Sequence, residues 1–114
     1  MTPGTSTKIR TIRLGDIAYA RSGDKGAGAN VGVIARTPAD YETIRRRLTA
    51  ADVESFFKPM GVGPVLRYEL PNLGALNFIL PNILDGGGSL SLRIDPQGKA
   101  LGQILLEMPL EVEP

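Results

Sequence analysis

The chain has 114 residues and a formal net charge of +1, so it has room for one domain and no overall field to attract nucleic acid or a membrane. It lacks cysteine and histidine, which excludes disulfides, thiol and imidazole chemistry and the usual zinc ligands. Hydrophobic residues make up 42% of the sequence and aromatic residues only 5%, so the core must consist mainly of Leu, Ile, Val and Ala. We expect a cytoplasmic protein, because no long apolar segment and no signal sequence is visible, and we expect no metal or cofactor.

The first third of the chain has the pattern of extended structure. Residues 1–7 are expected to be a disordered lead-in, and residues 8–114 a single domain. Residues 8–20 read as extended chain with an interruption at Gly15. A glycine-rich loop follows, and the short apolar run at residues 31–36 predicts a buried strand.

Two helical segments are predicted in the middle of the chain. Thr37 and Thr49 each stand three positions before an acidic residue, and Pro38 follows the first of them, which is typical of helix N-termini. Apolar residues at helical spacing predict two helices joined at Thr49, or one kinked helix, ending at residues 59–61. The arginine run at residues 45–47 is expected to be a solvated helix face, not a nucleic-acid site.

The second half of the chain alternates between strand and helix signals. Residues 65–70 alternate apolar and charged side chains and predict a half-exposed strand. Residues 73–84 carry apolar side chains three and four apart, which predicts a helix kinked or shortened at Pro81. Residues 90–94 alternate again and predict another strand.

The C-terminal segment is ambiguous between helix and strand. We predict a short helical or irregular start and a strand from about residue 104, where Pro109 allows only an edge strand. These elements together predict a single α+β domain, with a mostly antiparallel sheet covered on one face by helices.

The sequence ARSGDKGAGAN, at residues 20–30, is a candidate anion-binding loop. Its glycines permit positive φ, so that several backbone N–H groups could converge on one anion. The alternative is a solvated turn with a local ion pair, and the spacing fits neither the Walker loop nor the dinucleotide motif. The predicted ligand-binding residues of this segment are Arg21, Ser22, Gly23, Asp24, Lys25, Gly26 and Asn30. Lys25 and Asp24 are also the candidates for a catalytic acid–base pair.

Two further polar clusters are candidates for the same site. Asn72 is either a helix N-cap or a ligand contact, whereas Asn77 lies on an apolar element and needs a hydrogen-bond partner, so it could pin a neighbouring loop. Gly87, Gly88 and Ser89 belong to a second glycine-rich turn, which is either another anion nest or a plain turn. The three clusters form one site only if the sheet brings them together.

Three segments of the chain resemble a known family. ARSGDKGAGANVGVIAR, YELPNLGALNFIL and GGGSLSLRIDPQGKALGQILLEM are similar to the C-terminal domain of acyclic terpene utilisation proteins, the AtuA family, over roughly residues 12–110. The resemblance implies a ferredoxin-like fold in a domain that usually follows a much larger one and also occurs as a separate short protein. Asp85 and Leu90 depart from the family pattern, which argues against an anion site at the second glycine-rich turn.

The resemblance also implies a function, although the family assigns no catalytic role to these positions. We expect an accessory subunit of a large AtuA-type partner, in catabolism of acyclic terpenes or branched acyl-CoA, with an acyl-CoA or other carboxylate or phosphate bound at the first loop. The alternatives are a self-sufficient small hydratase or lyase acting on CoA esters, and a non-catalytic oligomeric scaffold. Homo-oligomers are expected because the C-terminal edge strand could pair with a second copy.

Overall fold

The computed structural model describes residues 9–25, 28–83 and 100–113 of the chain. The elements in chain order are β1 (Arg10–Arg13), η1 (Leu14–Asp16), β2 (Ala18–Lys25), β3 (Gly28–Ala35), α2 (Pro38–Arg47), α3 (Ala50–Phe57), η2 (Lys58–Met60), β4 (Leu66–Leu70), η3 (Pro71–Leu73), β5 (Ala75–Leu80), α5 (Ala100–Leu105) and β6 (Pro109–Val112). The predicted strand at residues 90–94 and the second glycine-rich turn lie outside the described residues.

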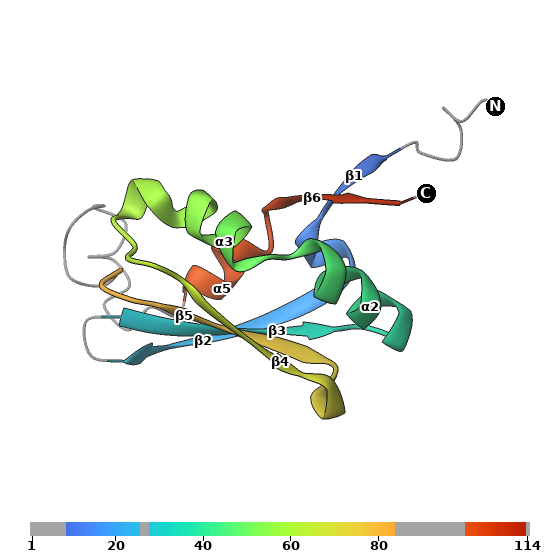
Figure 1. Ribbon diagram of the computed structural model, residues 1–114, viewed down its shortest axis with the longest axis horizontal. Coiled ribbons are helices and arrows are strands. Elements are labelled where there is room, and N and C mark those ends of the chain that lie inside the picture. Colours follow the sequence, from blue (N-terminus) through green and yellow to red (C-terminus); the bar gives the residue numbers. More distant parts are fainter. Residues whose placement is uncertain (1–8, 26–27, 84–99, 114) are drawn as a thin grey trace.

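The main sheet has four antiparallel strands in the order β2-β3-β5-β4, and β1 pairs with β6 in a separate antiparallel ribbon. The helices α2, α3 and α5 all lie on one side of the main sheet (Figure 1). Val31 of β3 and Phe78 of β5 point into this helical layer and are completely buried. The predicted α+β domain, with an antiparallel sheet covered on one face, is confirmed.

The two predicted helices form as separate elements, each with its predicted cap. The Thr37 hydroxyl accepts a hydrogen bond from the Asp40 backbone N–H at 3.0 Å, and the Thr49 hydroxyl accepts one from Asp52 at 3.1 Å. Each cap satisfies one N–H that the first helical turn leaves without a partner. Gly61, with φ of 81°, ends the second helical region in the left-handed conformation that glycine favours.

The predicted helix at residues 73–84 is wrong, because Ala75–Leu80 forms the strand β5 between β3 and β4. In a central strand the side chains of both neighbouring strands lie beside its own on each face, so apolar residues can occupy both faces and imitate a helical stripe. Pro71, Gly74 (φ of 60°) and Pro81 all interrupt a helix. The segment between them is long enough for a strand but too short for a stable helix.

The glycine-rich segment is the end of a β-hairpin and not an irregular loop. Strands β2 and β3 stay paired up to Lys25 and Gly28, so most of the predicted anion loop is extended backbone. The glycines with positive φ in the described ranges are Gly61 and Gly74, so Gly23 contributes no nest. A Cβ at Gly28 would lie 2.8 Å from the Leu80 carbonyl oxygen, so glycine is needed there for close packing against β5.

The C-terminal segment begins as a helix and ends as a strand, as predicted, but the strand starts later than residue 104. Helix α5 continues to Leu105 because Leu101 and Leu105, four residues apart, are both buried. Strand β6 then begins at Pro109, opposite Arg13 in the ribbon, where proline costs no hydrogen bond of the main sheet.

Candidate functional site

The apolar side of β4 faces away from the helices. Leu66, Tyr68 and Leu70 alternate along this edge strand and are 49%, 50% and 38% exposed. An amphipathic strand ordinarily buries its apolar side chains, so β4 presents the opposite arrangement in the isolated chain.

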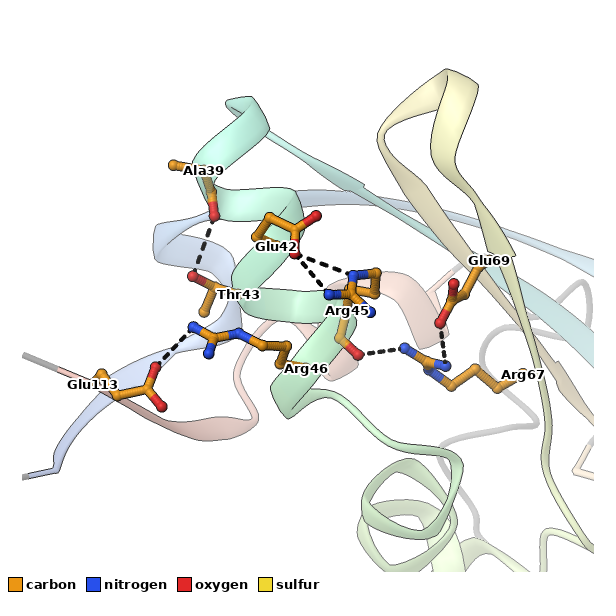
Figure 2. Close-up of polar contacts among 8 residues, drawn as sticks. All are labelled: Ala39, Glu42, Thr43, Arg45, Arg46, Arg67, Glu69 and Glu113. Atoms are coloured by element: carbon orange, nitrogen blue, oxygen red, sulfur yellow. Dashed lines mark hydrogen bonds and ion pairs between the residues drawn. The ribbon is translucent and has the colours of Figure 1, made fainter. Parts of the chain in front are cut away.

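The charged side of β4 holds the strand against α2. Arg67 donates from Nη2 to the Arg45 carbonyl oxygen at 2.7 Å and from Nε to the Leu48 carbonyl oxygen at 3.0 Å. Its third contact is an ion pair with Glu69, with 3.1 Å between Nη1 and Oε2 (Figure 2). These bonds satisfy carbonyl groups at the C-terminal end of α2, which explains why an arginine occupies the side of the strand that faces the helices.

The face of the main sheet opposite the helices carries three rows of side chains that cross all four strands. Residues directly opposite each other in antiparallel strands share a face, so the register defines these rows. The rows are Tyr19, Ile34, Ala75 and Leu70; Arg21, Gly32, Asn77 and Tyr68; and Gly23, Asn30, Ile79 and Leu66. We call this surface the open face, because no helix of the described chain covers it (Figure 1).

Four of the residues that the sequence singled out lie close together on the open face. Arg21 and Asn77 belong to its second row, and Gly23 and Asn30 to its third. The Asn30 amide nitrogen donates to Asn77 Oδ1 at 3.3 Å. Asn77 therefore finds the hydrogen-bond partner that its position required, although the partner is on a neighbouring strand and not in a loop. Arg21 is exposed, and its guanidinium makes no hydrogen bond or ion pair with any described residue.

The other predicted residues of the first segment lie elsewhere. Ser22 is on the helical side of β2, where its hydroxyl accepts a hydrogen bond from the Gly102 N–H at 3.1 Å and so helps to hold α5 against the sheet. The backbones of Asp24 and Lys25 belong to β2, but their side chains are outside the described part of the structure. The same applies to the whole of four predicted residues, Gly26, Gly87, Gly88 and Ser89.

Two glycines on the open face are not required by the packing of the chain. A Cβ at Gly32 would lie 3.9 Å from the Arg21 carbonyl oxygen and 4.0 Å from Asn77 Oδ1, which are ordinary contacts. At Gly23 the nearest atom would be Asn30 Oδ1 at 3.7 Å. Neither glycine has positive φ. Glycine weakens a strand interior and often marks a place where a ligand or another backbone approaches closely.

Comparison with known families identifies the domain. A family model described as the AtuA ferredoxin-like domain matches residues 12–111. The chain belongs to the AtuA ferredoxin-like domain family. This membership confirms the resemblance and associates the chain with AtuA-type proteins in general. No curated protein and no solved structure matches the chain.

A cavity of about 600 Å³ lies at one end of the main sheet of this AtuA ferredoxin-like domain. It is lined by residues of the β3 end, the first turn of α2 and the β4–β5 turn: Ala35, Arg36, Thr37, Pro38, Tyr41, Glu42, Pro71, Asn72 and Gly74. Asn72 lies here, in the short turn η3, so its predicted role as the N-cap of a helix is wrong. The cavity thus contains one predicted residue, and the open face contains four others.

The walls of the cavity differ in how well their polar groups are satisfied. Arg36 donates to the Gly15 carbonyl oxygen at 3.1 Å, and its guanidinium lies 4.1 Å from the centre of the Tyr19 ring. Tyr41 has a buried hydroxyl with no hydrogen-bond partner within the described chain. Because that hydroxyl is closed off from solvent, it is a feature of the wall and not a group that a ligand in the cavity would contact directly.

The arginine run at the end of α2 is neutralised by carboxylates. Arg45 contacts Glu42 at 2.8 Å, and Arg46 and Arg47 contact Glu113 at 2.9 Å and 2.7 Å; Figure 2 shows the first two of these pairs. The hydrogen bond from Arg47 is the main cause that lowers the pKa of the Glu113 carboxyl. These cations have partners within the chain, whereas Arg21 contacts none of the described acidic side chains.

Two general findings limit the chemistry of the described part of the chain. None of its helices is long and apolar enough to cross a membrane. Across residues 9–25, 28–83 and 100–113, no group of three or more acidic, histidine or cysteine side chains could hold a metal ion.

The sequence did not single out Gly32, Leu66 and Tyr68 as parts of a site. Leu66 and Tyr68 read as core positions of an amphipathic strand, and only the contacts of Arg67 reverse that orientation. Gly32 carried a weak signal, because a glycine in the middle of an apolar strand costs stability without a local reason.

Proposed function

We propose that this AtuA ferredoxin-like domain is an accessory, non-autonomous module that docks its open face on a large AtuA-type partner. The observation that carries the proposal is the orientation of β4, which exposes Leu66, Tyr68 and Leu70. Tyr19 adds a second aromatic side chain to the same face, at 52% exposure. A contiguous exposed apolar surface of this kind is typical of a protein–protein interaction site.

The composition of the open face also supports docking. Arg21 is the single charged residue in its three rows. Interface centres are depleted in charged residues and enriched in tyrosine and arginine, and Tyr19, Tyr68 and Arg21 fit that composition. Family membership supports a large AtuA-type protein as the partner, because the resemblance implies that this domain usually follows a much larger one.

We place the assembly in the catabolism of acyclic terpenes or branched acyl-CoA, where the module helps to enclose an anionic substrate. The family resemblance supports the pathway, and the exposed Arg21 beside the Asn30–Asn77 amide pair supports an anionic ligand. The chain then contributes binding surface, and its large partner contributes the catalytic groups.

The test is co-purification of the tagged chain with the large AtuA-type protein of the same organism, followed by calorimetry. Leu66→Asp and Tyr68→Asp should each weaken binding by at least about tenfold, because a charge would be buried at the centre of the interface. Ile9→Asp is the matched control, since Ile9 is also an exposed apolar residue, at 44%, but lies outside the open face. Absence of binding by the wild-type chain, or equal loss in the control, would refute the proposal.

The same observation supports a second occupant, another copy of the chain. Two open faces related by a twofold axis would bury the same residues from each copy. The two occupants compete for the same face, so the accessory role requires the large partner to displace the second copy.

A further inference from the structure

We propose that the second and third rows of the open face form a binding site for a small monocarboxylate with an apolar body. The inference deepens the proposed function and rests on it in one respect, namely that the open face is the working surface of the domain. The carboxylate would lie over Gly32, against the Arg21 guanidinium and the Asn77 amide.

Arg21 supplies the positive charge. It is exposed, without a hydrogen bond or ion pair to any described residue, and it is the single charge in the three rows. In contrast, Arg13, Arg46 and Arg47 each contact a carboxylate of the chain. A guanidinium forms two parallel hydrogen bonds with a planar carboxylate, so an unpaired arginine in rows that hold no other charged residue favours that partner.

The amide pair supplies a fixed hydrogen-bond donor beside this charge. Asn77 Oδ1 is engaged by the Asn30 amide at 3.3 Å, which orients the Asn77 side chain and leaves its own nitrogen as a donor. Tyr68 is directly opposite Asn77 on β4 and brings a hydroxyl to the same row. One cation and two neutral donors therefore lie in one line across the sheet, with no carboxylate among the three rows to repel an anion.

The two glycines leave room for the ligand. Gly32 lies between Arg21 and Asn77 in the second row, and Gly23 lies opposite Asn30 in the third. Since a Cβ at either position would meet only ordinary contacts within the chain, the space above them serves something other than internal packing. Close approach of a ligand to the strand backbone is one of the known reasons for a glycine inside a strand.

The flanking residues define the rest of the ligand. Ile34 and Leu70 border the polar row on one side, and Ile79 and Leu66 border it on the other, so an aliphatic chain finds apolar contacts in either direction. A phosphate is a poorer fit, because it carries more charge than one arginine neutralises, and the extended backbone of Gly23 offers no nest of N–H groups. This narrows the anionic ligand to a carboxylate.

The test is an NMR titration of the full ¹⁵N-labelled chain with hexanoate, acetate and inorganic phosphate at constant ionic strength. Hexanoate should shift the amide signals of Arg21, Gly32 and Asn77 in a saturable way and bind more tightly than acetate or phosphate. Arg21→Gln should raise the hexanoate Kd about tenfold or more, since it removes a charge-assisted hydrogen bond. Arg10→Gln, which removes another exposed arginine from outside the open face, should leave the Kd unchanged.

Gly32→Ala separates a ligand role from a structural one. The variant should keep or slightly gain thermal stability while binding hexanoate several-fold more weakly, because the added methyl group occupies the ligand's space. The proposal is overturned if hexanoate gives no saturable shift on the open face at millimolar concentrations, if phosphate binds as tightly, or if Arg21→Gln binds like the wild type. Hexanoate binding without partner docking would overturn only the accessory role, and docking without hexanoate binding would overturn only the carboxylate site.

Discussion

Gly28 and Gly32 belong to the same strand, yet the physical reasons for a glycine at the two positions differ. At Gly28 the absence of a side chain allows the hairpin to contact the end of β5, where a Cβ would lie 2.8 Å from the Leu80 carbonyl oxygen. At Gly32 the corresponding space is open. The first glycine is therefore structural, and the second faces the surface that we assign to a ligand.

This difference predicts opposite effects of the same substitution. Gly28→Ala should lower the free energy of unfolding by roughly 1–3 kcal/mol, because the obstructing atom is backbone and cannot rotate away. Gly32→Ala should leave stability unchanged or raise it by up to about 1 kcal/mol, since alanine reduces the entropy of the unfolded strand. Urea unfolding of both variants measures the difference, and equal losses would contradict it.

The buried hydroxyl of Tyr41 predicts an unusual result for a conservative change. Because this hydroxyl has no partner within the described chain, Tyr41→Phe removes a desolvated polar group without breaking a hydrogen bond. The free energy of unfolding should stay the same or rise by up to about 1 kcal/mol. A loss of more than about 1 kcal/mol in urea unfolding would mean that the hydroxyl is satisfied.

At the scale of elements, Arg67 joins β4 to the end of α2 and thereby decides which side of the strand faces outward. Its two bonds to the Arg45 and Leu48 carbonyl oxygens are contacts that an apolar side chain cannot make. Arg67→Met keeps the aliphatic stem but leaves both carbonyl groups without that donor. We expect a loss of roughly 1.5–3 kcal/mol in the free energy of unfolding. Arg10→Met, on the exposed ribbon strand β1, is the control and should change it by less than about 0.5 kcal/mol.

The contact between α2 and the end of the chain predicts a dependence on pH. The hydrogen bond from Arg47 lowers the pKa of Glu113, so this carboxylate adds stability above its unfolded pKa of about 4.3, and that stability is lost as the pH falls through the lower folded value. Glu113→Gln should therefore melt below the wild type near neutral pH and together with it in strong acid. Added salt should reduce the difference, because the pair is exposed. A difference that persists in strong acid would show that the pair is not its cause.

At the scale of the whole molecule, a sheet whose described helices all lie on one side predicts self-association. The isolated chain of 12.2 kDa should show a mass that rises towards that of a dimer with concentration, as the open faces of two copies pair. Leu66→Asp should keep the mass at that of one chain. Light scattering after gel filtration measures both, and a wild type that stays monomeric at high concentration would exclude the homo-oligomer.

The elements that the sequence predicted correctly are those with local causes. The caps at Thr37 and Thr49 are set by residues three positions apart, and the alternation of residues 65–70 is a property of the strand itself. The elements that failed depend on neighbours. The apolar pattern of β5 fits a helix until two flanking strands enclose it, and Asn72 looks like a cap until its turn proves to lead into a strand.

The candidate site divides in the same way. Arg21, Asn30 and Asn77 stood out as polar groups among apolar residues and glycines, and the register of three strands then placed them side by side. Ser22 stood out for the same reason, but alternation along β2 turns it to the helical side. Successive side chains of a strand point to opposite faces of the sheet, so residues adjacent in the sequence cannot all belong to one face.

The sequence by itself determined the α+β class, the helix starts, the family and the absence of thiol and imidazole chemistry, because these follow from composition and short-range patterns. Only the tertiary structure decided which side of β4 faces outward. That choice depends on Arg67 meeting carbonyl groups some twenty positions earlier in the chain, at Arg45 and Leu48. Likewise, the pairing of β3 with β5 places the hairpin of the glycine-rich segment in a sheet face that it shares with residues far along the chain.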